Sequence, residues 1–114
     1  MMFEEDMDFN NYQFRAKQTA IYPKEKALEY LGLGLVSEAG EVAGKIKKLI
    51  RDYNSELTPE LAHQISLEVG DVLWYVAQLC TELNTNMGKV AIDNIDKLQK
   101  RLDENKIKGD GDNR

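Results

Sequence analysis

The chain has 114 residues and a mass of 13.0 kDa, which fits one domain and leaves no room for a second. Its 15 lysine and arginine residues and 20 aspartate and glutamate residues give a formal net charge of -5 and an isoelectric point near 4.9. This acidic balance argues against a broad nucleic-acid-binding surface, although local lysines can still hold a small phosphorylated ligand.

The N-terminal stretch MMFEEDMDF is acidic and lacks the apolar core of a secretory signal. No apolar run reaches the length of about 18 residues that a transmembrane helix requires. Cys80 is the single cysteine and lies in the apolar run LWYVAQLC, so we expect a buried thiol rather than a disulfide or a nucleophile. We therefore expect a cytoplasmic protein that binds neither nucleic acid nor membrane.

The first two predicted helices are separated by a proline. They cover residues 8–20 and 24–52, and Pro23 lies between them in the sequence IYPK, where it disfavours helical geometry at the preceding residue. β-branched residues recur along the chain at helical spacing, and no window shows the period of two that is typical of a half-buried strand. The sequence therefore predicts an all-α fold.

The third and fourth predicted helices each begin at a capping residue. Thr58 offers a capping hydroxyl to a helix over residues 59–83, and Asn86 offers a side-chain oxygen to a helix over residues 87–105. A polar tail follows at about residues 106–114. Short connections between long helices favour antiparallel neighbours, so we predict a bundle of four to five helices.

Two pairs of acidic residues stand beside the apolar stripes of the second and third helices. Glu38 and Glu41 fall about 60° and 120° to one side of the first stripe, and Glu68 and Asp71 have the same offsets from the second. If the stripes pack together, up to four carboxylates meet at one rim, where they repel one another unless a cation lies between them. Oxygen ligands without histidine or cysteine favour Mg²⁺ or Mn²⁺ over zinc. For a single pair, a solvated helix flank is the alternative.

The third helix carries apolar side chains on two opposite sides. Its predicted core stripe consists of Leu61, Ile65, Val69, Val72, Val76, Leu79 and Leu83. Trp74 projects about 180° from this stripe. Either the first and fourth helices cover the Trp74 side or another subunit does, and we expect a homodimer or a homotetramer.

The acid pairs and their surroundings, EAGEVAGKIKKLIRD and EVGDVLWYVA, resemble the MazG-like nucleotide pyrophosphohydrolases, an all-α family. The family motif is Glu-x-x-Glu, a variable stretch and Glu-x-x-Asp, and the resemblance covers residues 12–102 within a single domain at 1–114. It implies cleavage of a nucleoside triphosphate between the α and β phosphates, releasing a monophosphate and pyrophosphate. It also implies that Mg²⁺, with Mn²⁺ as a substitute, is bound by Glu38, Glu41, Glu68 and Asp71.

Other residues are candidates for the substrate and the attacking water. Glu41, which is farther from the apolar stripe, is our candidate for positioning the water. The family places an asparagine and a lysine of the last helix near the phosphates, and Asn94 and Lys97 match them here, with Arg101 on the same edge at i+7. A solvated helix face would look similar. Lys45 shares the flank of the first acid pair and either binds phosphate or pairs with Glu41.

Three functions follow from these patterns. The first is Mg²⁺-dependent hydrolysis of nucleoside or deoxynucleoside triphosphates to monophosphates, which would serve to clear unwanted nucleotides. A phosphoribosyl-ATP pyrophosphatase is an alternative within the same fold. The third is a non-catalytic helical oligomer that binds a partner through the Trp74 side and holds a structural cation.

Overall fold

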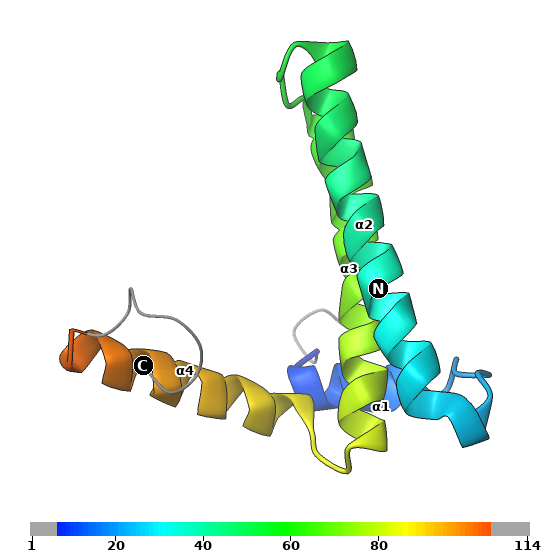
Figure 1. Ribbon diagram of the computed structural model, residues 1–114, viewed down its shortest axis with the longest axis vertical. Coiled ribbons are helices and arrows are strands. Elements are labelled where there is room, and N and C mark those ends of the chain that lie inside the picture. The colour runs from blue at the N-terminus through cyan, green and yellow to red at the C-terminus, as the bar shows by residue number, and fades with distance from the viewer. Residues whose placement is uncertain (1–6, 106–114) are drawn as a thin grey trace.

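The computed structural model describes residues 7–105, so the predicted tail at 106–114 lies outside the described residues. Its elements in chain order are α1 (Phe9–Lys17), the short 3-10 helix η2 (Lys24–Lys26), α2 (Ala27–Tyr53), α3 (Pro59–Glu82) and α4 (Met87–Asp103) (Figure 1). No strand occurs between residues 7 and 105, and the predicted all-α fold is confirmed.

Local capping signals set where three of the helices begin. The side chain of Asp8 accepts a hydrogen bond from the Asn11 amide at 2.7 Å, and Thr58 Oγ1 accepts one from the Leu61 amide at 3.2 Å. Asn86 caps α4 in the same way. These contacts satisfy amides that have no partner within the helix. The caps predicted for the third and fourth helices are therefore confirmed.

α2 and α3 form a long antiparallel hairpin whose connecting loop, residues 54–58, we call the hairpin tip (Figure 1). α1 packs against α3 at the opposite end, which we call the hairpin base, and α4 projects sideways from that base. The radius of gyration is 17.0 Å, whereas a compact chain of this length has about 13 Å. The short connection before α4 had predicted that this helix lies alongside α2 and α3. Within a single chain, it does not.

The buried core consists of two small clusters at the hairpin base. One contains Ala16, Ala77, Cys80 and Met87, and the other contains Tyr22, Ala27 and Leu31. Trp74 packs against both clusters, and its Nε1 donates a hydrogen bond to Thr19 Oγ1 at 2.8 Å. The sequence predicted that the first and fourth helices or another subunit cover the Trp74 side. Within the chain, residues of α1, the segment that follows it and Met87 at the start of α4 belong to the clusters against which Trp74 packs.

Parts of the predicted core stripe of α3 remain open. Val69 is 51% exposed and Leu83 is 61% exposed, because α1 packs on another side of α3 and α4 turns away. Cys80 is buried and free, as predicted, and its burial raises the pKa of its thiol. Within residues 7–105, no helix combines the length and the hydropathy needed to cross a membrane.

Candidate active site

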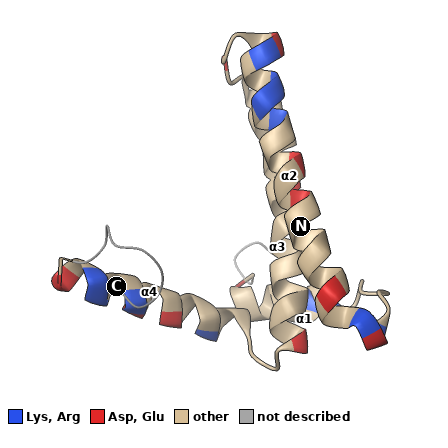
Figure 2. Cartoon of the chain, viewed as in Figure 1, with Lys and Arg blue, Asp and Glu red and all other residues tan. Residues whose placement is uncertain are grey.

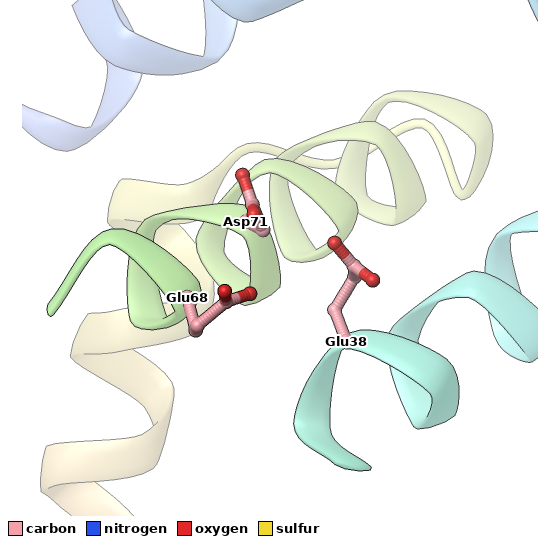
Figure 3. Close-up of side chains that lie close together, drawn as sticks. All are labelled: Glu38, Glu68 and Asp71. Atoms are coloured by element: carbon pink, nitrogen blue, oxygen red, sulfur yellow. The ribbon is translucent and has the colours of Figure 1, made fainter. Parts of the chain in front are cut away.

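Three of the four predicted acids converge midway along the hairpin. Glu38 comes from α2, and Glu68 and Asp71 come from adjacent positions on one side of α3 (Figure 3). Each contributes a carboxylate oxygen, and the three oxygens lie within 4.8 Å of one another. We call these three residues the acid cluster. The antiparallel packing of α2 and α3 produces this convergence, as the matched offsets of the two pairs had predicted.

Glu41 lies outside the acid cluster. Its side chain is exposed, three positions after Glu38 on α2. Its charge still reaches Glu38 and helps to raise the pKa of that residue. The structure thus puts Glu41 at the solvent-facing border of the cluster, and its roles as a metal ligand and in positioning water stay predictions.

The electrostatics of the acid cluster favour a bound cation. Partial removal from water raises the pKa of Glu38, and the charges of Asp71, Glu68 and Glu41 and a hydrogen bond with Asp71 raise it further. The donor set consists of carboxylate oxygens alone, which hard divalent ions such as Mg²⁺ and Mn²⁺ prefer. The residues present therefore fit the predicted metal.

Lys45 forms its ion pair across the hairpin. Its Nζ lies 3.8 Å from Glu68 Oε2, and its side chain is 35% exposed. The sequence had offered Glu41, one turn away on the same helix, as the alternative partner. The observed contact instead joins Lys45 to the acid cluster, and its role in binding phosphate stays a prediction.

Two tyrosines beside the acid cluster were not predicted as part of the site. The pKa of Tyr75 is raised by burial first, then by Tyr30 and the charges of Glu38 and Asp71. The pKa of Tyr12 is raised by burial and by the charge of Asp71. The spacing of Tyr75, four residues after Asp71, could have indicated this proximity. Tyr12 gave no such signal, because its position depends on the packing of α1.

The predicted phosphate-binding residues of α4 lie away from the acid cluster of their own chain. α4 projects from the hairpin base, whereas the acidic stretch of α2 lies farther up the hairpin (Figures 1 and 2). Asn94 is exposed, Lys97 is half-buried and Arg101 is buried. One chain does not bring these three residues together with Glu38, Glu68 and Asp71.

Comparisons with known proteins agree with the acid motif. The family model of the MazG nucleotide pyrophosphohydrolase domain matches residues 26–105, a range that contains both acid pairs and α4. Gene 37 protein of Mycobacterium phage L5 is 44% identical over 114 residues, which cover 95% of this chain and 100% of that protein. No solved structure matches the chain. The chain therefore belongs to the MazG nucleotide pyrophosphohydrolase family.

Proposed function

We propose that the protein hydrolyses nucleoside or deoxynucleoside triphosphates to monophosphates and pyrophosphate, with Mg²⁺ held by the acid cluster. The observation that carries this proposal is the convergence of Glu38, Glu68 and Asp71 within 4.8 Å, in a chain of the pyrophosphohydrolase family. Such a reaction fits the clearing of unwanted nucleotides from the cellular pool.

The proposed reaction is an in-line attack on the α phosphorus. A bound divalent ion supplies charge neutralisation and lowers the pKa of a water molecule. The water oxygen bonds to the α phosphorus, the bond from that phosphorus to the oxygen bridging to the β phosphorus breaks, and pyrophosphate leaves with the electron pair. Glu41, exposed at the border of the cluster, accepts the proton of the attacking water and passes it to solvent.

We further propose that a second copy of the chain completes the site, in a homodimer or a homotetramer. α4 leaves its own hairpin and carries exposed apolar side chains, with Ile92 and Ile95 each 62% exposed and Leu102 61% exposed. Packing of this helix on another hairpin would bury them. It would also bring Asn94 and Lys97 toward the acids of that copy, while Arg101 is already buried in its own chain.

The reaction is tested by incubating the protein with Mg²⁺ and a panel of canonical and modified NTPs and dNTPs, together with phosphoribosyl-ATP. Products are separated by chromatography. We expect a monophosphate and pyrophosphate from at least one nucleoside triphosphate, and loss of this activity in Glu38→Gln and Asp71→Asn. Glu56→Gln, in the exposed hairpin tip, serves as the control. Turnover of phosphoribosyl-ATP alone, or of nothing, would contradict the proposal.

A further inference from the structure

The charged residues of α2 change from acidic to basic toward the hairpin tip (Figure 2). Gln64 precedes Glu68 by four residues, which places it one turn closer to the tip on the same side of α3. On α2, Lys45 and Lys48 lie one and two turns beyond Glu41, and Figure 2 shows basic residues gathered in this part of the helix. The ion pair of Lys45 with Glu68 joins the two regions. Lys45 therefore connects the acid cluster with the basic part of α2.

A cavity of about 210 Å³ lies between α2 and α3, on the tip side of the acid cluster. It is lined by Lys45, Lys48, Leu49, Tyr53, Leu61, Gln64 and Ile65, none of which is acidic. The next acid along α2, Asp52, accepts hydrogen bonds from two nitrogens of Arg51 at 2.7 and 2.8 Å. The lining thus combines two lysines and a glutamine with apolar side chains and holds no carboxylate, which suits an anion.

On the base side of the acid cluster, the space between α2 and α3 is filled. A methyl group added to Gly34 would lie 2.1 Å from Tyr75 Cε1, so the ring of Tyr75 already fills the space between the helices on the base side of the acid cluster. A phosphate chain that starts at the acid cluster and lies between α2 and α3 would therefore run toward Lys45 and Lys48. Lys45 lies about 6 Å from Glu41 along the helix axis, which is one turn.

We propose that this cavity binds the β and γ phosphates of the substrate and holds pyrophosphate as it leaves. Lys48 and Gln64 are then positioning residues, and Lys45 exchanges its contact with Glu68 for one with phosphate. This inference rests on the proposed function. Leu49 and Ile65 add apolar surface to the lining beside the two lysines. Positive charge placed there stabilises the negative charge that develops on the leaving group.

The test is calorimetric titration of the full-length protein with inorganic pyrophosphate in the presence of Mg²⁺. Lys48→Gln should bind pyrophosphate about tenfold more weakly, as expected for loss of one charge-assisted hydrogen bond. Gln64→Glu should bind it more weakly still, because it adds a negative charge to the cavity. Lys47→Gln is the matched control, since Lys47 is exposed on the same helix and does not line the cavity. It should bind pyrophosphate as the wild type does.

Equal weakening in Lys47→Gln and Lys48→Gln would overturn the inference, because it would show an effect of net charge alone. Wild-type affinity in both Lys48→Gln and Gln64→Glu would also overturn it. Neither result requires turnover, so failure of this inference is distinguishable from failure of the proposed reaction. Pyrophosphate binding that depends on Lys48 in a protein that hydrolyses no nucleotide would support the cavity and contradict the reaction.

Discussion

At the scale of single residues, the crowding of carboxylates around Glu38 sets the energetics of the site. Its pKa is raised by partial burial and by the negative charges of Asp71, Glu68 and Glu41. At neutral pH, the charged form of Glu38 is therefore less stable in the folded protein than in the unfolded chain. A divalent cation among these oxygens would remove this disadvantage.

Glu38→Gln should stabilise the metal-free protein and remove most of its response to Mg²⁺. We expect the free energy of unfolding in a chelator to rise by about 0.5 kcal/mol, since the like-charged pair with Glu41 on the same helix costs about 0.2–0.5 kcal/mol and the acids of α3 add repulsion. Added Mg²⁺ should stabilise the wild type but not this variant. Urea denaturation with and without Mg²⁺ measures both effects, with Glu56→Gln as control. A less stable Glu38→Gln protein in chelator would count against repulsion within the cluster.

Tyr22 links stability to alkaline pH. Its side chain is 6% exposed, and its hydroxyl donates a hydrogen bond to Glu82. Burial, followed by this hydrogen bond and the charge of Glu82, raises the pKa of Tyr22 to about 12, above its ordinary value of about 10. Because the folded state holds this proton more tightly, the stabilisation is fully present below about pH 10 and is lost as the pH rises toward 12.

The wild type should lose stability between about pH 10 and pH 12, and this decline should be smaller in Tyr22→Phe. At neutral pH, the variant should be less stable by about 1 kcal/mol, because the hydrogen bond to Glu82 is absent. Urea denaturation at several pH values provides the comparison. Identical pH profiles for the two proteins would mean that Tyr22 does not titrate as described.

At the scale of the elements, the close approach of α2 and α3 positions the acid cluster. The two helices lie close together where Gly34 faces the ring of Tyr75, and a side chain at Gly34 has no room. Gly34→Ala should destabilise the protein by about 1–3 kcal/mol and weaken Mg²⁺ binding, because the helices must separate. Gly32→Ala is the control, since nothing lies within 4 Å of its added methyl group, and it should gain up to about 1 kcal/mol. Chemical denaturation at one fixed protein concentration compares the two, and equal stabilities would contradict this packing.

The elements also show how far local sequence determines this structure. Thr58 and Asn86 predicted helix starts correctly because a cap acts within one turn. Glu38 met the acids of α3 as predicted because helical periodicity and antiparallel packing fix its side of the hairpin. The surroundings of Trp74 could not be predicted, since Thr19 lies 55 positions away in the sequence. The direction of α4 was not predictable either, because its short connection does not fix an angle.

At the scale of the whole molecule, the extended shape of the chain supports the proposed assembly. Ile95 exemplifies the apolar side of α4, which one chain leaves exposed. We expect a mass of at least twice 13.0 kDa by light scattering coupled to size-exclusion chromatography. Ile95→Lys should shift the protein toward the monomer, whereas Asp96→Asn, an exposed neighbour with the same change in charge, should not. A monomeric wild type would contradict completion of the site by a second copy.

The most direct test of the proposed reaction is to run it in ¹⁸O-labelled water with Mg²⁺ and to locate the label by mass spectrometry. Attack on the α phosphorus predicts label in the nucleoside monophosphate and none in pyrophosphate at the moment of release. The label should be lost from the products when Asp71→Asn replaces the wild type, because that variant disrupts the acid cluster. Label in pyrophosphate, or release of nucleoside diphosphate and inorganic phosphate, would contradict cleavage between the α and β phosphates by attack on the α phosphorus.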